Sequence, residues 1–188
     1  MILLSFALVV GLALALWRAG TLAGLGRLAF RHTPLVFGAL GVQLLLFAGP
    51  SGLRAALDPL FAWLYVGSFA LLMAALAANL ALPGMKAVLA GVGLNTLVIA
   101  ANGGRMPSVL PDAGTSAVGA GPFAAAATNT AALTAQSYLT VLADVLSLPS
   151  VVPGYAISVG DLLIAAGVVY LLQRTARPRE RTAAVTVL

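Results

Sequence analysis

The sequence contains no cysteine and only one histidine, His32, and these two shortages exclude whole classes of site. Without cysteine the chain cannot form a disulfide scaffold or a thiolate metal centre. A single imidazole cannot build the two- or three-histidine centres of zinc enzymes, so we expect no metal site. Phosphate-binding glycine loops and nucleophile-elbow motifs are missing too, and nothing in the sequence indicates a cofactor.

Charged residues are also scarce. They make up 8% of the 188 residues, against 61% hydrophobic residues, and the mean hydropathy is +1.06. A soluble domain carries about 25% charged residues, so this chain cannot present a polar surface to water on all sides. The composition predicts an all-α integral membrane protein with one domain over residues 1–188. Membrane lipids are the expected partners, and nucleic acid is not, because basic and aromatic residues are not interleaved.

Apolar runs separated by glycine, proline and charge predict a polytopic helix bundle with about five transmembrane helices. The expected spans are 2–17, 35–47, 60–82, 87–101 and 159–172. An outer loop would then occupy 102–158 and a basic cytoplasmic tail 173–188. Several spans are shorter than the roughly 20 residues that cross a bilayer, so their flanks would have to complete the crossing.

The distribution of basic residues predicts an outer N-terminus and a cytoplasmic C-terminus. In this orientation the cytoplasmic side receives eight basic residues: Arg18, Arg27, Arg31, Lys86, Arg174, Arg177, Arg179 and Arg181. The outer side receives two, Arg54 and Arg105. This asymmetry follows the positive-inside rule and predicts a multi-pass protein.

The outer loop contains an alanine-rich stretch, 123–146, that we expect to be helical without crossing the membrane. Its alanine and leucine content favours helix. Its threonine, asparagine, glutamine and serine side chains make it too polar to face lipid on all sides. We therefore expect a re-entrant or interfacial helix. The alternative is a sixth span, which would place the C-terminal arginines outside, against the charge rule.

Asn95, Asn102 and Arg105 are the candidate binding residues. The two asparagines are seven residues apart and therefore share one face of a helix. Arg105 follows Gly103 and Gly104, which would let the backbone approach a ligand closely. Its guanidinium would suit a phosphate or a carboxylate. The structural alternative is that the asparagines join helices and that Arg105 extends to the lipid headgroups.

Asp144 and Asp161 are the candidate catalytic residues, because both lie among apolar neighbours where a carboxylate is costly. If the two carboxyl groups meet, repulsion would hold one protonated while the other stays ionised. That pair would suit the activation of water for amide hydrolysis. The structural alternative is that Asp161 forms a capping box with Ser158 at the start of the last helix, and that Asp144 faces water elsewhere.

Three motifs resemble those of a family of small polytopic bacterial membrane proteins of unknown function. They are N-G-G-R-M-P at 102–107, L-A-D-V-L-S-L-P at 142–149 and I-S-V-G-D at 157–161. This resemblance implies a location in the bacterial inner membrane and no particular activity.

The last third of the chain also resembles the lipoprotein signal peptidases, which are aspartic intramembrane proteases. That family has one aspartate in N-L-x-D-R and a second in F-N-x-A-D. Asp144 and Asp161 occupy similar places here. Val145 stands where the family has arginine, and Ala143, Ser158 and Gly160 also depart from its motifs.

Two classes of function therefore remain open. The first is a non-enzymatic binding, transport or assembly module with a polar pocket at the outer face, which would include Asn95, Asn102 and Arg105. The alternative is an aspartate-dyad hydrolase that acts on a membrane-embedded peptide or lipopeptide. Small residues spaced by four, such as Ala7, Gly11 and Ala15, allow close packing within the bundle or between protomers, so a homo-oligomer is also open.

Overall fold

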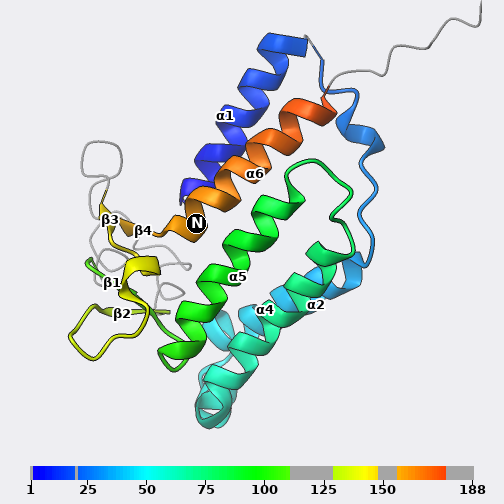
Figure 1. Cartoon of the computed structure of the whole chain (residues 1–188). Helices are drawn as coiled ribbons and strands as arrows, with labels where there is room; N and C mark the ends of the chain where they lie inside the picture. The colour runs from blue at the N-terminus through cyan, green and yellow to red at the C-terminus, as the bar shows by residue number, and fades with distance from the viewer. Residues whose placement is uncertain (1, 20, 111–128, 148–155, 177–188) are drawn as a thin grey trace, which may run out of the picture.

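The computed structural model describes residues 2–19, 21–110, 129–147 and 156–176, and most of these residues are helical (Figure 1). Five α-helices of 16 to 18 residues dominate this described part: α1 (Ile2–Ala19), α2 (Thr33–Ala48), α4 (Phe61–Ala77), α5 (Met85–Ala101) and α6 (Val159–Thr175). Each coincides, within a few residues, with an expected apolar span. The prediction of a largely α-helical chain is confirmed.

Only one helical stretch in the described residues is both long enough and apolar enough to cross a membrane. It is the 27-residue stretch Ser51–Ala77, which joins α3 (Ser51–Leu57), the 3₁₀ turn η2 (Asp58–Leu60) and α4. The apolar helices α1, α2 and α5 are shorter. A helix of 17 residues rises about 25 Å, somewhat less than the roughly 30 Å of a bilayer core.

Helix α4 ends at Ala77, five residues before the expected limit of 82, because the side chain of Asn79 forms hydrogen bonds that hold the chain at this end. The buried Asn79 side chain donates Nδ2 to the carbonyl oxygens of Ala75 (2.7 Å) and Arg31 (2.8 Å). Its Oδ1 accepts the Arg31 N–H at 2.8 Å. One side chain thus closes α4 and fixes the segment that leads from α1, through the turn η1 (Leu25–Arg27), to α2.

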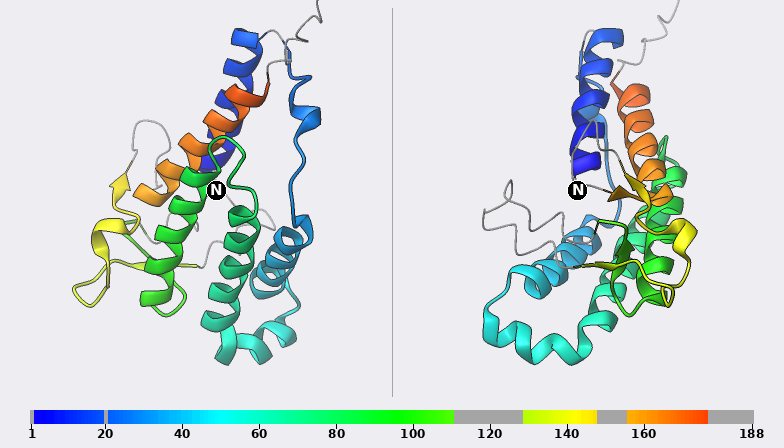
Figure 2. Two further views of the ribbon diagram at one scale, coloured as in Figure 1. Left: turned by 45° about the vertical axis from the view of Figure 1, so that its right-hand side comes forward. Right: turned by 90° about the vertical axis from the view of Figure 1, so that its left-hand side faces the viewer.

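The long helices form a row in the order α1, α6, α5, α4, α2, each packed mainly against its neighbours (Figures 1 and 2). Helices α1 and α6 run in the same direction and α5 runs opposite to them. Near the ends of α1 and α6, the Gly24 N–H donates to the Ala176 carbonyl oxygen at 3.3 Å. The arrangement is an open row, so α1 and α2 lie at its two edges.

Helices α5 and α6 approach each other closely at two pairs of glycines. A Cβ added at Gly167 would lie 2.7 Å from the Gly84 carbonyl oxygen, and one at Gly160 would lie 2.7 Å from the Gly91 carbonyl oxygen. No side chain fits at either distance, so the two backbones are in direct contact. Because Gly160 and Gly167 are seven residues apart in α6, both contacts fall on one face of that helix, and they meet Gly91 of α5 and Gly84 just before it.

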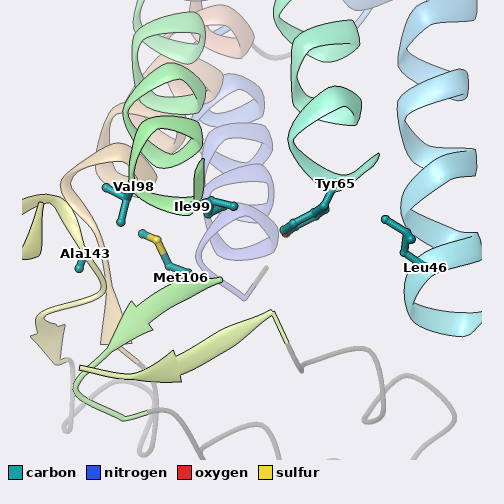
Figure 3. Packing of buried hydrophobic residues seen from close by; sticks show 6 residues of the cluster. All are labelled: Leu46, Tyr65, Val98, Ile99, Met106 and Ala143. Atoms are coloured by element: carbon teal, nitrogen blue, oxygen red, sulfur yellow. The ribbon is translucent and has the colours of Figure 1, made fainter. Parts of the chain in front are cut away.

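A small irregular layer covers the end of α5. Strand β1 (Met106–Ser108) pairs in parallel with β2 (Thr130–Ala132), and β3 (Leu146–Ser147) pairs antiparallel with β4 (Ala156–Ile157). Figure 3 shows Met106 and Ala143 from this layer near Val98 and Ile99 of α5, with Tyr65 of α4 and Leu46 of α2 farther along the same cluster. The buried cluster consists of Leu46, Tyr65, Val98, Ile99, Met106 and Ala143.

The expected helix over 123–146 is wrong where the structure describes it. Residues 129–146 form β2, the 3₁₀ turn η4 (Thr140–Leu142) and the start of β3, whereas 123–128 lie outside the described residues. The backbone finds partners in the buried strand β1, through Met106 N to the Asn129 oxygen (2.7 Å) and Asp144 N to the Pro107 oxygen (3.0 Å). Hydroxyl groups compete as well, because Ser137 Oγ accepts the Thr134 N–H at 3.0 Å.

Candidate functional site

Asn95, Ser158 and Asp161 form a ring of hydrogen bonds where α5 and α6 meet. Asn95 donates Nδ2 to Asp161 Oδ1 at 2.9 Å, and Asn95 Oδ1 accepts the Ser158 hydroxyl at 2.9 Å. Asn95 lies one turn beyond Gly91, and a Cβ at Gly160 would overlap its Oδ1. The glycines therefore bring the helices close enough for this ring to close.

The same residues, Ser158 and Asp161, also cap the first turn of α6. The fully buried Ser158 is the N-cap, and its Oγ accepts the Asp161 N–H at 3.0 Å. Asp161 Oδ2 in turn accepts the Ser158 N–H at 3.3 Å, which completes a capping box. The capping alternative for Asp161 is thus confirmed: both of its oxygens accept hydrogen bonds, and its charge lies at the positive end of the helix dipole.

Asp144 lies in the irregular layer and is held there by its backbone. Its N–H donates to the Pro107 carbonyl oxygen at 3.0 Å, and its carbonyl oxygen accepts the Val109 N–H at 3.1 Å. Its Oδ1 is buried, and no donor among the described residues reaches it. The structural alternative had Asp144 facing water; its side chain is instead half buried, because pairing with β1 draws the residue into the layer.

The environment of Asp144 favours its neutral form. Burial raises the pKa of the Asp144 carboxyl to about 7, and the negative charge of Asp161 adds to the rise. The structure thus brings the two aspartates into electrostatic interaction. One is a hydrogen-bonded carboxylate, and the other holds a proton near neutral pH.

The side chain of Asn102 has different hydrogen-bond partners from that of Asn95. Its Nδ2 donates to the Val98 carbonyl oxygen (2.8 Å) and the Tyr138 carbonyl oxygen (3.0 Å), and its Oδ1 accepts the Tyr138 N–H at 2.9 Å. All three bonds go to backbone groups. Asn102 therefore terminates α5 and fastens the 129–147 segment to it.

Arg105 lies in a separate hollow of about 510 Å³ between the end of α2, α3, η2 and the start of α4. Its guanidinium carbon is 5.9 Å from the centre of the Phe61 ring. The turn before it is tight, because Gly104 has φ +86° and a Cβ there would lie 2.9 Å from the Ala62 Cα. The hollow is lined by Leu46, Phe47, Ser51, Arg54, Ala55, Leu57, Asp58, Phe61 and Arg105.

The expected single pocket of Asn95, Asn102 and Arg105 is therefore divided into three places. Sequence reasoning missed Arg54 and Asp58 as companions of Arg105. A signal was present, since Arg54 and Arg105 are the two basic residues that the charge rule places on the outer side. No group of three or more metal-ligating side chains occurs within residues 2–19, 21–110, 129–147 and 156–176.

Comparison with known proteins gives a family and no activity. No curated protein and no solved structure is significantly similar to the chain. Residues 27–173, more than three quarters of the sequence, match a family of unknown function. The match includes α2 to α6, the hollow at Arg105 and both aspartates, so the chain belongs to the family of unknown function DUF5317.

Proposed function

We propose that the protein is a multi-pass membrane protein that binds an anionic group in the hollow lined by Arg54 and Arg105. The binding would be non-enzymatic, and the hollow would open at the outer face of a bacterial inner membrane. Separate observations support the membrane placement and the binding site.

The membrane placement is supported by the outward faces of the helices. Large apolar side chains point away from the protein along several of them, including Val9 (66% exposed), Phe37 (67%) and Leu97 (58%). Trp17 and Trp63 are exposed by 82% and 79%, near the ends of α1 and α4, where indole rings favour the headgroup region. Such surfaces are unfavourable in water, and a lipid environment removes that cost.

The binding site is supported by one observation above the others. The two arginines assigned to the outer side are 51 positions apart in sequence, yet they line the same hollow. Among the described residues that line the hollow, Asp58 supplies one carboxylate against the two guanidinium groups, so this lining has an excess of positive charge. A guanidinium fork suits phosphate or carboxylate, and the Phe47 and Phe61 rings, 5.7 Å apart between centroids, offer an apolar wall.

The hollow therefore fits an anion attached to an apolar body. Phenyl phosphate is a suitable probe because it combines both features, and phenol is its neutral control. We expect the purified protein in a nonionic detergent to bind phenyl phosphate and not phenol by isothermal titration calorimetry. Replacing Arg54 or Arg105 by Gln should weaken binding at least tenfold, because each removes a charge-assisted hydrogen bond worth about 1.5–3 kcal/mol.

Arg27→Gln is the matched control, since Arg27 lies in η1 and does not line the hollow. This variant should bind phenyl phosphate as the wild type does. Equal binding of phenol, or unchanged affinity in Arg54→Gln and Arg105→Gln, would contradict the proposed site.

An aspartate-dyad hydrolase is the second candidate. It is favoured by Oδ1 of Asp144, which no donor among the described residues reaches, and by the electrostatic interaction of Asp144 with Asp161. A protonated and an ionised carboxyl together can activate water. The substrate would be a membrane-embedded peptide or lipopeptide. Incubation with a dye-labelled lipopeptide tests this candidate: cleavage should occur and should be lost in both Asp144→Asn and Asp161→Asn. Absence of cleavage, or cleavage that survives either substitution, would reject it.

A further inference from the structure

A second concave surface lies at the edge of the helix row, between α1 and α6. It is a groove of about 760 Å³. Its walls include large apolar side chains, among them Phe6 and Val10 on α1, four residues apart, and Leu162 and Val169 on α6, seven residues apart. This spacing keeps the apolar lining on one face of each helix. The groove therefore lies along one face of each helix.

Small side chains and one hydrogen bond keep this groove open. Ala165 and Ala166 line it on α6, where larger residues would fill the space. Farther along the same helix, Gln173 donates Nε2 to the Gly11 carbonyl oxygen at 2.9 Å and ties the two helices together. Gln173 itself lines the groove, so this hydrogen bond joins the two helices along it.

One end of the groove is strongly basic. Arg18 lies in the last turn of α1 and Arg174 in the last turn of α6, and both line the groove. The Arg174 guanidinium carbon is 5.9 Å from the centre of the Tyr170 ring, which places the cation over an aromatic wall. Because α1 and α6 are parallel, both arginines lie at the same end.

We propose that this groove binds an acyl chain of an anionic phospholipid, with the lipid phosphate between Arg18 and Arg174. From Leu162 to Arg174 α6 rises about 18 Å, slightly more than half of the roughly 30 Å hydrocarbon core. The groove is therefore long enough for one acyl chain, which extends through about half of the hydrocarbon core, and it follows most of the 17 residues of α6 from the basic end. This inference rests on the membrane part of the proposed function and not on the hollow at Arg105.

Charge complementarity favours a lipid over a second copy of the chain. The aspartates of the described residues, Asp58, Asp144 and Asp161, all lie toward the opposite end of the helices from the two arginines. A second copy packed in parallel on this face would bring none of these carboxylates to the arginines. An anionic headgroup supplies the missing charge, and its acyl chain covers the apolar walls.

The test is native mass spectrometry of the full chain in nonionic detergent with equal amounts of phosphatidylglycerol and phosphatidylcholine. We expect preferential retention of one phosphatidylglycerol molecule. Each of Arg18→Gln and Arg174→Gln should weaken this binding about fivefold, and the double variant about thirtyfold, from about 1 kcal/mol for each arginine. Arg27→Gln, a basic residue outside the groove, should bind phosphatidylglycerol as the wild type does.

A steric variant tests the groove without changing charge. Ala166→Phe should fill it and lower phosphatidylglycerol retention about tenfold, whereas Ala13→Phe, at an exposed position of α1 outside the groove, should not. Inorganic phosphate should displace no lipid, since it has no acyl chain.

Four results would overturn the proposal: equal retention of both lipids, an equal loss in Arg27→Gln, displacement by inorganic phosphate, or a change from dimer to monomer in Ala166→Phe with lipid retention intact. The last result would assign the groove to contact between two copies. Phenyl phosphate binding at Arg54 and Arg105 is measured on the same variants and should not change, so failure of one site is distinguishable from failure of the other.

Discussion

Asp144 has a buried carboxyl oxygen that no donor among the described residues reaches, although water or a proton would satisfy it. The carboxyl group keeps its proton to about pH 7 in the folded protein, because burial disfavours the ion and Asp161 repels it. In the unfolded chain the proton leaves near the ordinary value of 3.8. Between these two values the folded state binds more protons than the unfolded state.

Stability should therefore fall as the pH rises from about 4 to about 7 and stay low above that range. Asp144→Asn removes the titrating group, so its melting temperature should exceed that of the wild type by more at pH 8 than at pH 5. For a chain of this size 1 kcal/mol corresponds to about 2–4 °C, and we expect at least that difference. The exposed Asp58, replaced by Asn, is the control and should keep the wild-type profile. A wild-type protein more stable at pH 8 than at pH 5 would contradict this account.

Asn95 satisfies two groups at once, the half-buried Asp161 carboxylate and the buried Ser158 hydroxyl. Asn95→Ala should lower the free energy of unfolding by about 1–3 kcal/mol, because it leaves polar groups without partners. Thermal unfolding in detergent measures the loss. Leu97→Ala, at an exposed position of the same helix, should have a smaller effect. Equal effects of the two substitutions would show that the ring contributes no more than side-chain volume.

At the scale of helices, the two glycine contacts between α5 and α6 decide where the polar ring can form. Gly84 and Gly91 face Gly167 and Gly160 in opposite order, as expected for antiparallel helices. Any side chain at these positions would push the backbones apart. It would also separate Asn95 from Asp161, which depends on the same spacing.

Gly160→Ala should accordingly destabilise the protein by about 1–3 kcal/mol, the usual range for overpacking. Gly41→Ala in α2 is the matched control, since nothing lies within 4 Å of an added Cβ there. That variant should be neutral or stabilising by about 0.5–1 kcal/mol, because alanine favours helix over glycine. Chemical or thermal unfolding of both variants in the same detergent shows whether each substitution lowers or raises the free energy of unfolding. A neutral Gly160→Ala would argue against direct backbone contact.

The helices were predictable because each depends on local sequence. A run such as 87–101 contains only apolar, small and uncharged residues, and the observed α5 differs from it by two residues at its start. The capping box was equally visible, since Ser158 and Asp161 are three residues apart. The end of α4 was missed because Asn79 acts through Arg31, 48 positions away.

The irregular layer could not be predicted in the same way. Its conformation depends on β1, a buried strand whose partners lie at 129–133 and 144, and no local pattern encodes that pairing. Alanine content favoured helix at 123–146, and long-range backbone pairing decided against it over the described part. The residues that surround Arg105 are likewise determined by packing, because Arg54 reaches the hollow from the separate helix α3.

For the whole molecule, the long helices alternate in direction along the chain, so successive connections lie at opposite ends of the helices. With eight basic residues predicted at one end and two at the other, the charge rule assigns the first end to the cytoplasm. A fluorescent protein fused after Leu188 should therefore fluoresce, which indicates the cytoplasmic side. Alkaline phosphatase inserted at Gly114 should be active, which indicates the outer side. Both reporters in one compartment would contradict the five-span arrangement, and release of the protein by carbonate would contradict membrane insertion itself.

The neighbours of α6 in the row have a consequence for biogenesis. Gly11 of α1 lies against Leu172 of α6, so this contact joins two helices from opposite ends of the sequence. During synthesis α1 emerges first, and its partner emerges only after α2, α4 and α5 have been made. Until then the Gly11 face of α1 and the glycine face of α5 are both uncovered. Insertion of α6 between them is thus the step that completes the row, and a chain stopped before Val159 would leave two unpaired surfaces for quality-control proteases to recognise.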